Sequence, residues 1–168
     1  MNDETKITIR KALPEDIDAY TNCANTCWQA AYKGIVPDEY LDSMLTNKAL
    51  REKNLERLQN PGFCQHYCVL HGPETIGLLI IDTMHSEIWA VYLTPAYWGR
   101  GYGRELLNFA TSVLKNAGHK KVTLWVFEAN HRARRFYEKH GFVLSGQQKT
   151  VDKYGGVPLV EVQYMLAI

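Results

Sequence analysis

Residues 87–103, E-I-W-A-V-Y-L-T-P-A-Y-W-G-R-G-Y-G, constrain the fold of this chain more than any other stretch. Residues 88–94 are apolar on both faces, as expected for a strand in the middle of a sheet. Three glycines then occupy alternate positions (Gly99, Gly101 and Gly103), and a helix follows whose apolar residues share one face as far as Gly118. This order of strand, glycine turn and helix predicts an α/β fold with the strand at its centre.

The glycine turn is predicted to hold a phosphate group. Glycines leave no Cβ atoms to stop a ligand from approaching the backbone. The N-terminus of the helix offers unpaired N–H groups and the positive end of its dipole, and Arg100 and Arg104 add full positive charges. Neither common nucleotide motif fits. No Lys-Ser or Lys-Thr pair follows the glycines, and the third glycine of a dinucleotide fingerprint would fall on Arg104.

Segment 98–103, Trp-Gly-Arg-Gly-Tyr-Gly, resembles the central motif of the GCN5-related N-acetyltransferase (GNAT) family, Gln/Arg-x-x-Gly-x-Gly/Ala. Trp98 stands where Gln or Arg is usual, which leaves the backbone cradle intact and changes one side-chain contact. A second segment, 127–142, is similar to the same family's order of strand, Asn130, helix, Tyr137 and a Gly-Phe pair. The resemblance covers roughly residues 6 to 166 and is clear from Ile76 onward.

Composition and charge are those of a soluble globular chain. The 168 residues are 46% hydrophobic and 22% charged, enough for one domain with a real core. The net charge of +1 gives no bulk electrostatic reason to bind nucleic acid or a membrane, and no apolar run is long enough to span a bilayer.

The charges are unevenly divided along the chain. Residues 95–141 hold nine Lys or Arg against three Glu, whereas residues 1–94 hold eight basic against thirteen acidic residues. A basic half suits a polyphosphate cofactor and an acidic half suits a cationic acceptor. For the outlying lysines, solvated helix faces are the simpler explanation.

The hydrophobic pattern predicts one α/β domain over residues 1–168, a GNAT-like fold with a mixed central sheet and helices on both faces. Its cofactor-binding core is expected at about 76–142. The expected strands are 6–11, 64–71, 75–82, 88–94, 121–128, 142–148 and 158–167. The expected helices begin at Pro14, at 38, at 46, after the glycine turn and at 131. The succession of strand, helix and strand around 88–128 predicts a crossover between parallel strands.

The four cysteines show no metal-ligand spacing, and buried thiols in a reducing compartment explain them better. The acidic start, Met1 to Thr5, lacks the apolar run of a signal peptide. The expectation is a cytoplasmic protein without a metal. The oligomeric state stays open, with a homodimer as one option.

The family resemblance implies acetyl-CoA as acetyl donor and a primary amine of a small molecule or peptide as acceptor. It implies that backbone groups of Val91, Tyr92 and Leu93 at the end of the central strand bind the pantetheine arm. Asn130 is expected to contact the same arm, or to cap its helix, or both. Arg134 is a candidate for phosphate or adenosine. With the turn residues, the expected cofactor contacts are Val91, Tyr92, Leu93, Trp98, Gly99, Arg100, Gly101, Tyr102, Gly103, Arg104, Asn130, Arg134 and Tyr137.

Two catalytic candidates follow from what acetyl transfer requires. Glu87 begins the central strand, is predicted to share a face with Trp89, Val91 and Leu93, and is the candidate base for the acceptor's proton. The alternatives are a solvated glutamate, or a water chain involving His85 and Asp82. Tyr137 is the candidate acid for the departing thiolate, a role that the resemblance implies; the alternative is a core tyrosine.

The acceptor is not identified by the sequence. Trp28 and Tyr32 suit an aromatic wall for a cation, although both also have core spacing, and Asp152 and Tyr154 lie in a late loop able to gate the site. The alternative to an enzyme is a non-catalytic, regulatory domain that binds acetyl-CoA without turnover.

Overall fold

The computed structural model describes residues 6–168, so the prediction about a signal peptide at residues 1–5 lies outside the described residues. The strands are β1 (Ile7–Lys11), β2 (Cys64–His71), β3 (Glu74–Asp82), β4 (Glu87–Leu93), β5 (Lys121–Phe127), β6 (Val143–Val151) and β7 (Leu159–Ala167). The helices are α1 (Ile17–Tyr32), α2 (Asp38–Thr46), α3 (Lys48–Gln59), α4 (Tyr102–Asn116) and α5 (His131–Lys139). Short 3-10 turns lie at Pro14–Asp16 and Pro95–Tyr97.

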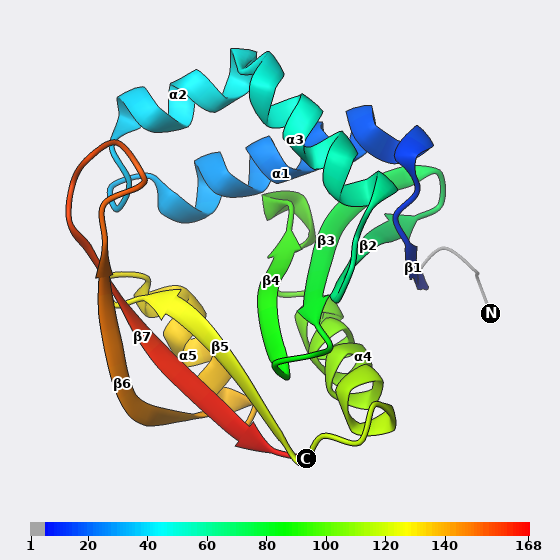
Figure 1. The fold of residues 1–168 in the computed structure, drawn as a ribbon, viewed down its shortest axis with the longest axis vertical. Coiled ribbons are helices and arrows are strands. Elements are labelled where there is room, and N and C mark those ends of the chain that lie inside the picture. The colour runs from blue at the N-terminus through cyan, green and yellow to red at the C-terminus, as the bar shows by residue number, and fades with distance from the viewer. Residues whose placement is uncertain (1–5) are drawn as a thin grey trace.

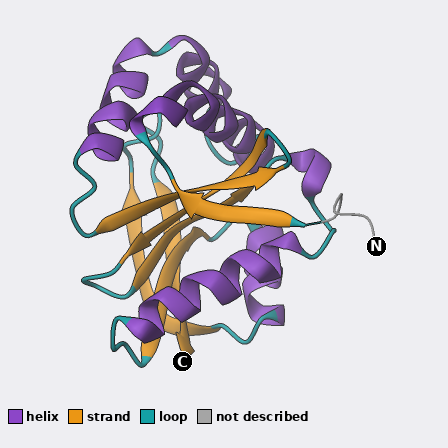
Figure 2. Cartoon of the chain, turned by 90° about the vertical axis from the view of Figure 1, so that its right-hand side faces the viewer, coloured by secondary structure: helices purple, strands orange, loops and turns teal. Residues whose placement is uncertain are grey.

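These elements form a single α/β domain around one seven-stranded sheet, in the order β1-β2-β3-β4-β5-β7-β6 (Figure 1). Only β4 and β5 run parallel, and every other neighbouring pair is antiparallel. Helix α1 packs with α2 and α3 over one face, and α4 and α5 lie on the other, so that the strands are sandwiched between helices (Figure 2). The predicted mixed sheet with helices on both faces is confirmed.

The sequence predicted every strand and helix to within a few residues, and α4 with β5 forms the predicted parallel crossover. The first helix differs at its start. Residues Pro14–Asp16 form a 3-10 turn before α1 because Pro14 fixes the first position, and the Asp16 side chain accepts a hydrogen bond from the Leu13 N–H at 2.8 Å. The chain therefore enters α1 through a separate turn.

Strand β4 is irregular at Trp89. Ala90 pairs with Ile80 of β3, but Ile88 already pairs with the adjacent Ile81, so Trp89 is the extra residue of a β-bulge. Trp89 is 55% exposed, which corrects the prediction of a strand buried throughout. Beyond this point β4 leaves β5: the two strands pair only at Glu87–Thr123 and Ile88–Leu124. Figure 1 shows them diverging from there.

The bulge also corrects the predicted orientation of Glu87. In a regular strand, side chains on the same face are two or four residues apart. Ile88 and Val91 are three residues apart, yet both pack against α4, because the bulge at Trp89 shifts the alternation of the side chains. Glu87 precedes Ile88 and pairs with Asp82, so it lies on the opposite face, which α1 covers. The prediction that Glu87 shares a face with Val91 and Leu93 is wrong.

The two helical layers bury separate cores. Between the sheet and α4, Leu107, Ala110 and Leu114 pack on buried residues of β3, β4 and β5. Under α1, Tyr20, Cys23 and Cys27 pack on β2 and β3. Cys23, Cys27 and Cys68 are buried and Cys64 is half-buried, and all four are free thiols. Within residues 6–168, the helices are too short or too polar to cross a membrane.

His66 is a buried polar residue on β2, 7% exposed, whose Nδ1 lies 2.8 Å from the Tyr20 hydroxyl of α1. Burial, helped by the charge of Arg57, lowers the pKa of His66 to about 4. An unfolded chain has an ordinary histidine with a pKa of about 6.5. Because only the unfolded state takes up a proton between these values, protonation removes stability as the pH falls from about 6.5 to about 4.

We predict that wild-type stability falls across this window by on the order of 3 kcal/mol on account of His66. A His66→Asn variant keeps a hydrogen-bond acceptor near the Tyr20 hydroxyl. Its free energy of unfolding is expected to change less with pH than that of the wild type, even if the variant is less stable at pH 7. Urea unfolding at pH 7, 6, 5 and 4 measures this. The substitution of an exposed histidine, His131→Asn, serves as control. If the free energy of unfolding changed equally with pH in wild type and His66→Asn, the prediction would be contradicted.

Candidate active site

A cavity of about 670 Å³ runs through the sheet where β4 and β5 diverge. On one face it is lined by the glycine turn and by residues of α5, and on the other by α1 residues including Trp28 and Tyr32. Its walls between these ends come from β4 and β5. Because the gap joins both faces of the sheet, two ligands that enter from opposite sides can meet inside it.

The glycine turn forms the α4 end of the cavity. Gly99 and Gly101 have φ values of 73° and 88°, a left-handed conformation that other residues adopt only with strain, and no atom lies within 4 Å of an added Cβ. Gly103 is needed for packing, since its Cβ would lie 2.9 Å from the Phe136 ring. Gly101 caps α4 without a side-chain hydrogen bond, and its carbonyl oxygen accepts from the N–H groups of Arg104 and Glu105 at 3.1 and 3.4 Å. The positive end of the helix dipole therefore faces this turn.

Two cations border this turn. Arg104 lines the cavity from the first turn of α4. The Arg132 guanidinium of α5 lies 3.2 Å from the centre of the Trp98 ring, and burial lowers the pKa of Arg132. The Trp98 indole N–H in turn donates to the Leu93 carbonyl oxygen at 2.7 Å. A helix N-terminus, glycines without side chains and two arginines fit the pyrophosphate of a nucleotide-like cofactor.

Tyr137 and Asn130 reach the cavity from α5. The Asn130 side chain accepts a hydrogen bond from the Ala133 N–H at 3.1 Å, which confirms it as the helix cap. Tyr137 packs on Phe136 and Phe142 at ring-centre distances of 5.4 and 5.8 Å. Burial raises the pKa of Tyr137, so its hydroxyl stays protonated at neutral pH and is able to donate a proton.

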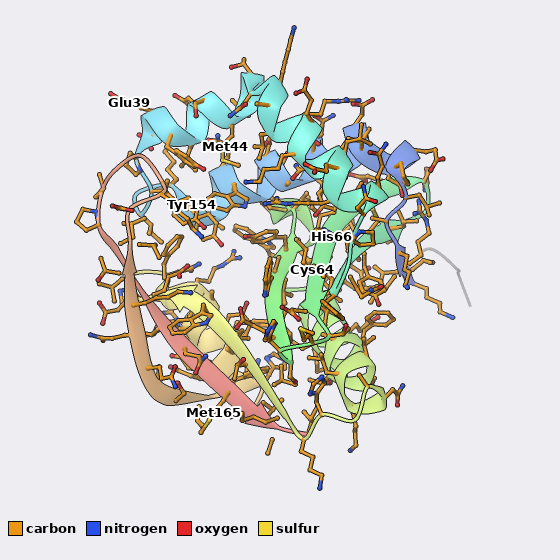
Figure 3. The ribbon with its side chains drawn as sticks, in the orientation of Figure 1. Glu39, Met44, Cys64, His66, Tyr154 and Met165 are labelled. Carbon is orange, nitrogen blue, oxygen red and sulfur yellow. The ribbon has the colours of Figure 1, made fainter. Side chains whose placement is uncertain are left out.

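The α1 end of the cavity is aromatic. Tyr154, which the β6–β7 loop carries to the level of α1 and α2 (Figure 3), lies 5.3 Å from Trp28 and 5.7 Å from Phe127 between ring centres. The Tyr32 and Tyr92 hydroxyls are 3.2 Å apart. Burial raises the pKa of Tyr32 to about 12 and that of Tyr92 well above its usual value, so both remain neutral hydrogen-bonding groups.

Glu87 does not line the cavity itself. The indole of Trp125, which does line it, donates a hydrogen bond to the Glu87 carboxylate. Burial raises the pKa of Glu87, although the charge of Lys149 partly opposes this. Glu87 therefore lies beside a residue of the cavity wall, while His85 and Asp82 pair with each other at 2.8 Å in the preceding turn.

The structure brings most of the predicted site residues together. The ones that line the cavity are Val91, Tyr92, Leu93, Trp98, Gly99, Gly101, Gly103, Arg104, Asn130 and Tyr137. Three other predicted cofactor contacts do not line the cavity. Arg100 lies 5.2 Å from the Tyr97 ring, Tyr102 is buried in the core, and Arg134 donates to the Tyr164 hydroxyl at 3.1 Å. Arg134 thus ties α5 to β7.

Several cavity residues were absent from the sequence-based prediction: Trp89, Trp125, Phe127, Arg132 and Glu161. One signal was available, because Glu161 is a single carboxylate within the otherwise apolar start of the last strand, L-V-E-V. Among residues 6–168, no three His, Cys, Asp or Glu side chains gather in a way that could hold a metal ion.

The fold and cavity together are those of a group-transfer enzyme domain, with a glycine turn and two arginines on one side of its sheet and an aromatic entrance on the other. The family model described as "Acetyltransferase (GNAT) family" matches residues 18–142. The chain belongs to the GNAT family of acyltransferases, whose members use acetyl-CoA.

Individual relatives agree with this membership. A spermidine N(1)-acetyltransferase of Thermoplasma acidophilum is 28% identical over 94% of this chain and 98% of its own length. An uncharacterized N-acetyltransferase of Methanocaldococcus jannaschii is 39% identical over 80% of this chain and 60% of that protein. Among solved structures, PaiA N-acetyltransferase from T. acidophilum in complex with coenzyme A is 26% identical over 97% of this chain and 99% of that one, with a TM-score of 0.77.

A GCN5-related N-acetyltransferase from Rhodopseudomonas palustris has a TM-score of 0.81, covers 100% of this chain and 99% of its own, and is 18% identical. At that identity the likeness concerns the fold alone.

We predict that Gly101→Ala weakens the binding of coenzyme A by about ten-fold or more, because the new Cβ enters the open space of the cradle and disturbs the turn. Gly146→Ala is the matched control, since Gly146 has the same φ of 88° and equally open surroundings but lies on β6. Isothermal titration with coenzyme A and a melting curve measure both variants. Both variants are expected to lose a similar amount of stability, but only Gly101→Ala is expected to lose affinity for coenzyme A. Equal affinities of the two variants for coenzyme A would contradict a phosphate-binding role for the glycine turn.

Proposed function

We propose that this chain transfers an acetyl group from acetyl-CoA directly to the primary amine of a small molecule. The observation that supports this most is the cavity between β4 and β5, which joins a phosphate cradle and Tyr137 on one side to an aromatic entrance on the other. Direct transfer requires donor and acceptor in one space, and this cavity offers one.

In this proposal the cofactor's pyrophosphate is held by the turn from Gly99 to Gly103, by Arg104 and by Arg132. The pantetheine arm lies along the freed end of β4, where backbone groups of Val91, Tyr92 and Leu93 pair with it as a neighbouring strand would. A backbone N–H in the same segment polarises the thioester carbonyl. Acetyl-CoA supplies the activated acetyl group.

Two proton transfers complete the proposed reaction. The acceptor arrives as an ammonium with a pKa of roughly 10, and Glu87 receives its proton through water, because Glu87 lies next to Trp125 of the cavity wall without lining it. Tyr137 donates its hydroxyl proton to the departing thiolate. The raised pKa of Glu87 makes it a better base than an ordinary carboxylate. Tyr137, like any tyrosine near neutral pH, is protonated and so available as the acid.

A small, positively charged amine is the acceptor favoured by the site. Aromatic rings at the α1 end suit a cation with an alkyl chain, and the name of the Thermoplasma acidophilum relative gives spermidine as that protein's acceptor. We also propose a cytoplasmic location, since the four free thiols suit a reducing compartment, and no nucleic-acid or membrane partner. Sedimentation analysis decides between monomer and homodimer.

We predict that Tyr137→Phe lowers kcat by about 10² or more while the affinity for coenzyme A changes less than about two-fold. The reason is that the ring is kept and only the proton donor is lost. Thiol release from acetyl-CoA in the presence of amines, with a separate coenzyme A titration, measures the two quantities. Tyr67→Phe, a buried tyrosine that packs on Phe109 away from the cavity, is the control.

The same assay separates the enzyme from a regulatory domain that only binds the cofactor. An enzyme releases thiol with at least one amine of a panel of diamines, polyamines, amino acids and short peptides. Stabilisation of the chain by acetyl-CoA without thiol release on any of them would favour the binding domain. An unchanged kcat in Tyr137→Phe would remove Tyr137 as the acid.

A further inference from the structure

The ammonium group of Lys149 is held beside the cavity by an aromatic ring and carboxylates. Its Nζ lies 4.0 Å from the centre of the Trp125 ring and 3.3 Å from Oε2 of Glu161. Glu87 is a second carboxylate within electrostatic reach of Lys149 and accepts the hydrogen bond from Trp125. An indole face together with carboxylates is a general way for proteins to bind an organic ammonium ion.

The sheet register shows that this arrangement is built from four adjacent strands. Glu161 of β7 pairs with Lys149 on β6 and with Phe127 on β5, and Trp125 lies two residues before Phe127 on the same face. Glu87 pairs with Thr123, which alternation places on that face as well. In its corrected orientation, Glu87 therefore lies on the same face of the sheet as Trp125 and Glu161, which is the proposed acceptor side.

Trp125, Glu161 and Lys149 differ in whether they line the cavity. Trp125 and Glu161 line it, whereas Lys149 does not. The Glu161 side chain is only 14% exposed, while that of Lys149 is 45% exposed and comes from the edge strand β6. A long, flexible and partly hydrated lysine is able to swing into water, but the enclosed carboxylate then needs another cation. The lysine is thus the replaceable partner.

We propose that Trp125 and Glu161 form a subsite for the second ammonium group of a diamine or polyamine acceptor, which displaces Lys149 on binding. The inference rests on the proposed function and locates the charge that selects its acceptor. The reacting amine lies toward Tyr137, the alkyl chain lies along the aromatic rings of Tyr32 and Phe127, and the distal ammonium replaces the Lys149 ammonium. Lys149 neutralises the subsite in the free protein.

The test compares 1,4-diaminobutane with butylamine, which differ only in the second amine. The wild-type chain is expected to favour the diamine in kcat/KM by about ten-fold or more, which is the scale of one charge-assisted contact. Glu161→Gln is expected to raise KM for the diamine by about ten-fold while KM and kcat for butylamine stay within about two-fold. Trp125→Leu removes the ring and is also expected to raise KM for the diamine. Because Trp125 hydrogen-bonds to the proposed base Glu87, kcat is expected to fall for both amines in this variant.

Lys149→Met provides the sharper readout because it removes the competing cation. KM for the diamine is expected to fall by about three-fold or more, with butylamine unchanged. Lys153→Met is the matched control: Lys153 also lies over a ring, 5.0 Å from that of Tyr154, but has no carboxylate partner among the described ion pairs. Melting curves with coenzyme A confirm that each variant is folded.

An equal rise in KM for both amines in Glu161→Gln would overturn the proposal, because Glu161 would then support the fold or the common reaction. A higher KM for the diamine in Lys149→Met would overturn the displacement of Lys149. If the wild type acetylates both amines equally well, this inference fails and the proposed function stands. If it releases thiol with no amine at all, both fail.

Discussion

The parting of β4 from β5 after two residue pairs is the constraint on which the rest of this structure depends. The two strands begin as neighbours in parallel register, and the bulge at Trp89 directly follows their last pair. A bulge adds a residue to one strand and increases its twist, so β4 turns away with β3 while β5 stays with β7. Backbone groups that a closed sheet would have used internally become available to a ligand, and the cavity connects both faces.

The two entrances of this cavity have opposite chemistry. On the α4 side, the glycine turn carries two positive charges, Arg104 and Arg132, which suit a phosphorylated cofactor. On the α1 side, aromatic rings and the carboxylate of Glu161 present surfaces that attract an ammonium ion. In the proposed reaction these opposite charges sort the two ligands before they meet, and Tyr137 lines the shared cavity. Arg104 and Arg132 come from the basic stretch 95–141, whereas Glu161 lies outside the acidic stretch 1–94.

Local patterns in the sequence predicted the fold and most of the residues that line the α4 side of the cavity, because those features depend on neighbours along the chain. A glycine in a left-handed turn, an asparagine cap and an apolar helix face leave their mark within a few residues, as Gly101, Asn130 and α4 show. The bulge at Trp89 depends on the partner strand and left no mark, so the face of Glu87 was predicted wrongly. Trp125, Glu161 and Lys149 come together only through the register of three strands, which the sequence alone does not reveal.

The central claim is that coenzyme A enters between the diverged strands and presents its sulfur to Tyr137. A crystal structure of the complex with coenzyme A tests it most directly. The account predicts the pyrophosphate at the turn from Gly99 to Gly103, the pantetheine arm beside Val91, Tyr92 and Leu93, and the sulfur within hydrogen-bonding reach of the Tyr137 hydroxyl. A cofactor bound elsewhere, or a sulfur facing away from Tyr137, would contradict the account.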